Sequence, residues 1–174
     1  MRRRARAVPV PTLRKTKRAV PAPLRLDVQC DVQVVSLPDT RVLKRWVRAA
    51  LGPARRPTVI NLRIVGRRES AMLNRRYRKK VGATNVLSFP PGPIPAPLSA
   101  RFLGDIVICA PVVKAEAASQ GKAERAHWAH MLVHGILHLR GYDHVTPPQA
   151  ILMEALETRV LRRLGFPNPY ATDR

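Results

Sequence analysis

Apolar and polar residues alternate almost strictly between positions 26 and 34. Asp and Gln side chains separate the apolar members of this run, which are Leu26, Val28, Cys30, Val32 and Val34. A period of two is the pattern of a strand buried on one face. After Pro38 and Asp39, apolar residues recur at helical spacing, and the pair Gly52 and Pro53 predicts the end of that helix.

Short apolar runs and amphipathic stretches follow one another along the rest of the chain. Three further strands are predicted at 58–65, 84–89 and 103–110. Four further helices are predicted at about 69–78, 112–119, 122–139 and 147–164. Five prolines between positions 90 and 97 indicate an exposed loop. We therefore expect an α+β fold of α/β character, with a small mixed four-stranded sheet packed against about five helices.

The charge of the chain is far from balanced, because 32 Lys and Arg stand against 11 Asp and Glu, a formal net charge of +21. Self-repulsion on this scale opposes folding, and a polyanionic partner is the usual reason for it. Binding to phosphates releases counterions, so the composition favours RNA or DNA over a neutral substrate. The competing interpretation is that proteins of the source organism are basic in general.

The length of 174 residues, 45% of them hydrophobic, is enough for one domain with a normal core. Residues 1–24 stand apart, with eight Lys and Arg, no acid and four prolines. We predict a disordered basic tail over 1–24 and a single folded domain over 25–174. The tail either contacts RNA phosphates or is a solvated extension without a role of its own.

Nothing in the sequence points to a membrane or to secretion. No apolar stretch approaches the ~20 residues of a membrane span, and the tail lacks the apolar core of a secretory signal. Cys30 and Cys109 stand singly within apolar runs, which indicates reduced thiols rather than a disulfide. We predict a cytoplasmic protein that does not contact membranes.

The five histidines of the chain all fall between positions 127 and 144. His134 and His138 are one turn apart on the predicted long helix, so their rings point the same way. Gly141 can reverse the chain after the helix and return His144 to the same point. Three imidazoles with no cysteine nearby leave a fourth position open to water, as in a catalytic zinc site. We predict one Zn²⁺ per chain, held by His134, His138 and His144 on the long helix and the following turn.

The same segment is similar to the HExxHxxGxxH signature of zinc proteases, with one difference. The residue after the first histidine should be Glu, the general base of those enzymes, and here it is Gly135. A glycine takes no proton, which speaks against a peptidase. A metal-bound water can still attack a phosphodiester. His127 and His130 precede the motif and are each expected to be a packing or surface residue, with support of the site from behind as the weaker alternative for His130, one turn before His134.

Four motifs in matching order resemble the YbeY endoribonuclease family. They are LN followed by YRKK (Leu73 to Lys80), TNVLSFP (Thr84 to Pro90), LGDIVI (Leu103 to Ile108) and HGILHLRGYDH (His134 to His144). The resemblance spans roughly residues 26–165 and leaves the basic tail outside. Two positions depart from the family pattern, because Val81 stands where an Asp usually ends the YRxKD motif and Val145 replaces a residue that is often acidic.

The resemblance implies a single-strand-specific, metal-dependent endoribonuclease. Such an enzyme acts in ribosomal RNA maturation, at the 3′ end of the small-subunit RNA, and in ribosome quality control, with the ribosome or ribosomal proteins as further partners. The family's zinc ligands correspond to the three histidines named above. Its functional arginine corresponds to Arg78, which we expect to stabilise charge on the phosphate during cleavage. Without the resemblance, Arg78 would be one cation among several on a solvated helix end.

Three further residues are candidates for supporting roles. Asp143 and Tyr142 are expected to accept the second N–H of a metal-bound histidine, unless Asp143 only caps the turn. Asp105 supports either the site or the loop before its strand.

Two other functions stay open. One is a non-catalytic ribosome assembly factor in which zinc only holds the helix and turn together. The other is a zinc metallopeptidase, against which Gly135 and the charge both speak.

Overall fold

The computed structural model describes residues 22–32, 37–53, 56–93 and 101–171. Its strands are β1 (Leu24–Cys30), β2 (Thr58–Val65), β3 (Val86–Phe89) and β4 (Phe102–Cys109). Its α-helices are α1 (Thr40–Leu51), α2 (Arg67–Leu73), α3 (Ala110–Ser119), α4 (Glu124–Leu139) and α5 (Pro147–Arg163). A π-helical turn, η1 (Asn74–Arg78), continues α2. The predicted α+β fold is confirmed.

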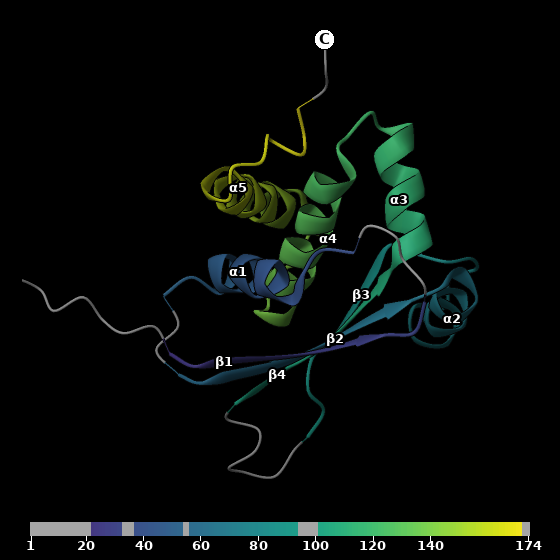
Figure 1. Cartoon of the computed structure of the whole chain (residues 1–174), viewed down its shortest axis with the longest axis horizontal. Helices are drawn as coiled ribbons and strands as arrows, with labels where there is room; N and C mark the ends of the chain where they lie inside the picture. The colour runs from purple at the N-terminus through teal and green to yellow at the C-terminus, as the bar shows by residue number, and fades with distance from the viewer. Residues whose placement is uncertain (1–21, 33–36, 54–55, 94–100, 172–174) are drawn as a thin grey trace, which may run out of the picture.

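The four strands form one mixed sheet in the order β1-β2-β4-β3. β1, β2 and β4 run parallel, and β3 pairs with β4 in the antiparallel direction at the edge. Helices α1, α4 and α5 lie on one side of this sheet (Figure 1). Because β3 is the edge strand beside β4, and α4 packs on both, the edge of the sheet and the end of α4 come together.

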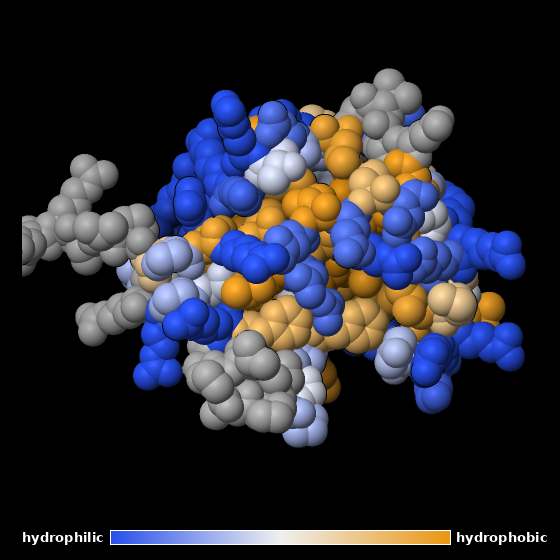
Figure 2. Space-filling model, turned by 60° about the horizontal axis from the view of Figure 1, so that its bottom comes forward, coloured by the Kyte–Doolittle hydropathy of each residue, from blue (hydrophilic) through white to orange (hydrophobic). Residues whose placement is uncertain are grey.

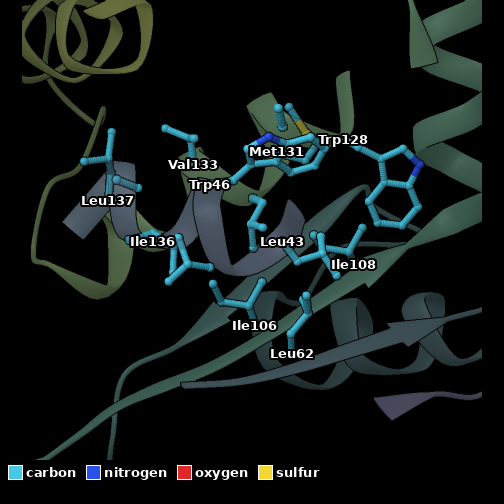
Figure 3. Packing of buried hydrophobic residues seen from close by; sticks show 14 of the residues in the cluster. Leu43, Trp46, Leu62, Ile106, Ile108, Trp128, Met131, Val133, Ile136 and Leu137 are labelled. Atoms are coloured by element: carbon cyan, nitrogen blue, oxygen red, sulfur yellow. The ribbon is translucent and has the colours of Figure 1, made fainter. Parts of the chain in front are cut away.

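The hydrophobic core fills the space between the sheet and these helices. Every second residue of β2 is fully buried, whereas Asn61 and Arg63 between them are exposed. Side chains of α1, α4, β2 and β4 meet in this layer (Figure 3). Helix α4 is buried on almost all sides from His127 to Leu139, so it is a rigid support for the side chains that it carries. No helix within the described ranges is both long and apolar enough to cross a membrane.

The other face of the sheet carries polar pairs. Asn61 donates to the Asp105 carboxylate at 2.8 Å, and Arg63 pairs with Asp31 and Glu69, each at 2.7 Å. Asp105 therefore stabilises this side of the sheet through its hydrogen bond with Asn61. On the face shown in Figure 2, hydrophobic residues gather in the middle and hydrophilic ones surround them.

Several element boundaries differ from the sequence-based expectations. β1 begins at Leu24, within the predicted tail, because this residue already pairs with Thr58. Residues 1–21 of the predicted tail, and residues 33 and 34 of the predicted first strand, lie outside the described residues, as does the loop after residue 93 as far as residue 100. α3 follows β4 without a loop, because Pro111 fits the first turn of a helix.

The predicted helix at 69–78 is in fact two pieces. Its first part is the α-helix Arg67–Leu73, and its last five residues form the π-helical turn. Lys79 ends this turn in a left-handed conformation, with φ of 57°. A π-turn often marks a functional site, and residues of this one line the same pocket as His138 near the end of α4.

Candidate metal centre

Local chain geometry brings three histidines together after α4. His134 and His138 occupy successive turns of the helix, which ends at Leu139. Gly141 adopts φ of 86°, a left-handed value that favours glycine, and its N–H donates to the His138 carbonyl at 2.9 Å. Tyr142 N–H donates to the Leu137 carbonyl at 3.1 Å, so the chain folds back over the helix end. His144 thereby returns to the face that carries the other two rings.

The three imidazoles converge on one point. One ring nitrogen from each of His134, His138 and His144 lies within 4.8 Å of the others. Nε2 of His134 and Nε2 of His138 are 3.0 Å apart. Donors at about 2 Å from a tetrahedral ion are about 3.3 Å apart, so the distance between the first pair is close to that of two metal ligands. This cluster could bind a metal ion.

A buried carboxylate that the sequence analysis missed holds the first of these rings. Glu157 of α5 is 0% exposed, and its Oε1 lies 2.7 Å from Nδ1 of His134. Its Oε2 lies 2.9 Å from Nε2 of His130 and also accepts the hydroxyl of Tyr170. A carboxylate only accepts, so His134 donates from Nδ1 and keeps the lone pair of Nε2 for the cluster.

Protonation states in the cluster suit a metal site. Burial raises the pKa of the Glu157 carboxyl, but hydrogen bonds from His130, His134 and Tyr170 outweigh it and lower that pKa to about 2. Burial, with the neighbouring rings of His134 and His144, lowers the pKa of His138. The lowered pKa favours the neutral, metal-binding form of His138, and the ionised Glu157 carboxylate favours a cation nearby.

The sequence signal for Glu157 was its position on a helix. On α5 it shares the buried side with Met153, Val160 and Leu161, so it is a charged residue on an apolar face. An acid in such a position is rarely buried without a partner. The sequence does not identify that partner, because the partner is determined by the packing of α5 against α4.

Of the residues considered as supports for the ligands, Asp143 has the alternative role that the sequence analysis left open, which is to cap the turn. Asp143 accepts the backbone N–H of His144 at 2.8 Å, whereas its carboxylate is 3.9 Å from Nδ1 of His138. Its shorter contact is therefore with the backbone of the turn and not with a ligand ring. Tyr142 packs against the hydrophobic core, with the Arg140 guanidinium 5.3 Å from its ring centroid. Asp105 lies on the far face of the sheet, paired with Asn61.

The histidines form one wall of a cleft of about 160 Å³. Arg78 and Asn74, the last and first residues of η1, also line the cleft, together with Lys80. The edge strand and the two residues before it complete the lining with Thr84, Asn85, Val86, Leu87 and Ser88. The structure thus brings Arg78, predicted from sequence, into the same cleft as the three histidines.

Gly135 has a packing role between two of the histidines. A Cβ on this residue would lie 3.1 Å from Oγ of Ser88 and 3.3 Å from the side chain of Ile106. The Ser88 hydroxyl donates to the Gly135 carbonyl at 3.1 Å, which ties α4 to the edge strand. A side chain at this position would require Ser88 and Ile106 to move by a few tenths of an ångström, so the packing here suits a glycine.

His127 belongs to a separate buried pair. Its Nε2 lies 2.8 Å from the Glu116 carboxylate, which also accepts the Asn85 amide at 3.0 Å. Burial lowers the pKa of His127 even though Glu116 raises it. The pair joins α3, α4 and the start of β3, and so fixes one side of the cleft.

Comparisons with known proteins agree with the motifs. A family model described as Endoribonuclease YbeY matches residues 28–165. The protein named Endoribonuclease YbeY from Methylococcus capsulatus is 53% identical over 135 residues, which are 78% of this chain and 88% of that protein. Its namesake from Nitrosomonas europaea is 45% identical over 169 residues, 94% of this chain and 98% of that protein.

Among solved structures, the solution structure of TM1509 from Thermotoga maritima is similar, with 20% identity and a TM-score of 0.48. The alignment covers 82% of this chain and 91% of that one. The family match includes the whole sheet from Val28 onward, the π-turn and the histidine cluster. On the extent of that match and the identity to its named relatives, this chain belongs to the YbeY endoribonuclease family.

Proposed function

We propose that the protein is a zinc-dependent endoribonuclease that cuts single-stranded RNA. Its role would be ribosomal RNA maturation, at the 3′ end of the small-subunit RNA, and ribosome quality control in the cytoplasm. The observation that carries the proposal is the convergence of three histidines in a cleft that also holds Arg78 and Lys80. The names of the relatives and the net charge of +21 support RNA as the substrate.

His134, His138 and His144 would hold one Zn²⁺. Bound there, the ion supplies a Lewis acid for a phosphate oxygen and a water whose pKa falls towards neutrality. Three nitrogen ligands and an open cleft are the donor set of a catalytic rather than a structural zinc site. Glu157 keeps His134 in the tautomer that presents Nε2, and α4, packed on several sides, keeps the two helical ligands in place.

The reaction adds water across a phosphodiester. The oxygen of water joins the phosphorus, the bond from phosphorus to one sugar oxygen breaks, and a proton passes to that leaving oxygen. Negative charge builds up on the phosphoryl oxygens during this step. Arg78 presents a fork of donors that matches two of these oxygens, and Lys80 adds a second positive charge in the same cleft.

Two other functions are compared with this proposal. A metallopeptidase of the HExxH type needs a general base where Gly135 stands, and a glycine has no side chain that could accept a proton. A non-catalytic assembly factor needs zinc only for its fold. Against it, His144 is exposed and the cleft is open, whereas structural zinc sites are closed by four protein ligands.

The direct test is elemental analysis of the purified protein together with a cleavage assay on unstructured RNA. We expect about one zinc per chain, and cleavage that a chelator abolishes and added zinc restores. Double-stranded RNA and casein serve as comparison substrates. Zinc-free protein that cleaves RNA at full rate, or casein cleavage in place of RNA cleavage, would overturn the proposal.

The assembly-factor alternative requires a separate comparison. A His134→Ala variant is compared with the wild type for thermal unfolding and for RNA cleavage. Loss of cleavage with a retained cooperative transition supports the enzyme. A wild-type protein that binds zinc and ribosomal RNA but never cleaves it supports the assembly factor.

A further inference from the structure

The turn that follows α2 carries an unusual density of positive charge. Five of its six residues from position 75 to position 80 are Arg or Lys, and no acid occurs between Glu69 and Asp105. The turn is well defined, because the Asn74 amide donates to the Gly82 carbonyl at 2.9 Å and closes its base. Asn74 is itself buried, so the base of the turn is anchored while the cations project into solvent.

These cations divide between two neighbouring depressions. Arg78 and Lys80 line the histidine cleft described above. The other three cations line a separate groove of about 690 Å³, whose lining is Ala71, Met72, Arg75, Arg76, Lys79, Val81 and Gly82. The Asn74–Gly82 hydrogen bond joins one lining residue of each depression, so the groove begins where the cleft ends.

Among the residues that the structure describes, no acidic side chain forms an ion pair with the cations of the groove. In the described part of the chain, the ion pairs of Arg and Lys side chains involve Arg25 and Arg63, and neither belongs to this turn. The Arg76 guanidinium lies 5.4 Å from the ring centroid of Tyr77, and Lys79 donates to the Arg76 carbonyl at 3.1 Å. These contacts hold the two side chains at the surface without cancelling their charge.

Apolar side chains are exposed beside the cations. Met72 is 59% exposed and Val81 is 97% exposed, although both are large hydrophobic residues. A ligand that presents closely spaced negative charges together with flat apolar surfaces would satisfy both kinds of side chain. Single-stranded RNA has this chemistry, because its phosphates alternate with unstacked bases.

We propose that Arg75, Arg76 and Lys79 form a phosphate-binding track for the RNA strand next to the cleavage site, with Met72 and Val81 in contact with its bases. The inference rests on the proposed function and adds to it the direction in which the substrate leaves the cleft. The three cations contribute to binding rather than to the chemical step, since they line a groove that the histidines do not line. Val81, which departs from the acid usual in the family, keeps this groove free of negative charge.

The test compares two variants that each lose three positive charges. Arg75→Gln/Arg76→Gln/Lys79→Gln removes the track. Arg159→Gln/Arg162→Gln/Arg163→Gln removes three exposed cations of α5 that line a groove without any of the three histidines. The measurement is fluorescence anisotropy of a labelled unstructured RNA of about 12 nucleotides, a length within single-strand site sizes, as a function of salt. Zinc content and thermal unfolding are recorded for each protein.

For the track variant we expect at least a tenfold weaker binding at 0.1 M salt and a salt slope smaller by about two, since each phosphate contact on a single strand contributes about 0.7. The α5 variant is expected to change binding less than threefold. Equal losses in both variants, or wild-type affinity in the track variant, would overturn the track while RNA cleavage by the wild type stands. A wild-type protein that neither binds nor cleaves the RNA overturns the proposed function as well.

Discussion

The carboxylate of Glu157 lies 2.7 Å from Nδ1 of His134 and thereby links α5 to the histidine cluster on α4. The same carboxylate accepts Tyr170 from the C-terminal segment, so two parts of the chain beyond the HGILHLRGYDH motif meet at the back of the site. Groups behind a metal ligand set its tautomer and its basicity. The geometry of the candidate centre therefore depends on residues that the motif does not include.

The first prediction concerns this carboxylate. A Glu157→Gln variant keeps the size of the side chain but loses the charge that aligns His134, so we expect zinc affinity to fall by about 10- to 100-fold. Competition with a chromogenic chelator measures the affinity without any RNA. Glu154→Gln, an exposed position on the same helix, is the matched control. Equal zinc affinity in Glu157→Gln and wild type would show that the contact only stabilises the packing of the helices.

The second prediction concerns Arg78. Replacement by Ala is expected to lower the cleavage rate by about 10²- to 10³-fold, because a donor aimed at developing charge contributes on that scale. Zinc content should stay at the wild-type level, since no hydrogen bond or ion pair among the described residues joins Arg78 to the three histidines. Arg78→Lys should recover only part of the rate, because Lys lacks the planar fork of donors. An unchanged rate in Arg78→Ala removes this residue from the mechanism.

The sequence was sufficient where contacts are local. The three histidines converge through a helical turn and a glycine reversal, and both are visible within eleven residues. β2 begins and ends as predicted, because its alternation of apolar and polar residues and the residues that flank it indicate the same bounds. The π-turn was missed since no hydrophobic period distinguishes it from a continuing α-helix. Glu157 and His130 were paired by packing between two helices, which a pattern along one chain cannot specify.

The third prediction separates metal binding from folding. His144 is exposed and lies on the turn after α4, so His144→Ala should leave the stability of the metal-free protein within about 0.5 kcal/mol of wild type. Zinc at 100 times its Kd should stabilise the wild type by about 2.7 kcal/mol, and this gain should disappear in the variant. Thermal unfolding with and without zinc measures both quantities. Val145→Ala, the exposed neighbour, should keep the full gain. A zinc-dependent gain that survives in His144→Ala would place the ion elsewhere.

The fourth prediction concerns pH and the buried His127. Burial lowers its pKa below 6.5 in the folded state, while the unfolded chain retains the ordinary value. As the pH falls below the unfolded value, the unfolded state takes up the proton first, so the free energy of unfolding decreases. One such group contributes a slope of at most about 1.4 kcal/mol per pH unit, confined to the window between the folded and unfolded pKa.

The measurement is urea unfolding of the metal-free protein between about pH 7.5 and 5.5, with wild type and His127→Gln side by side, across the ordinary histidine pKa. His138 also has a lowered pKa, but it is present in both proteins and cancels in the comparison. The pKa of Glu157 is about 2 in the folded protein, so its contribution to the free energy of unfolding is lost only at pH values below the range of the measurement. We expect the wild type to lose more stability than the variant over this range, because only the wild type has a buried His127 to protonate. Parallel curves would mean that burial and Glu116 cancel and leave the pKa of His127 unshifted, and a wild type that loses less stability than the variant would mean that the ion pair outweighs burial.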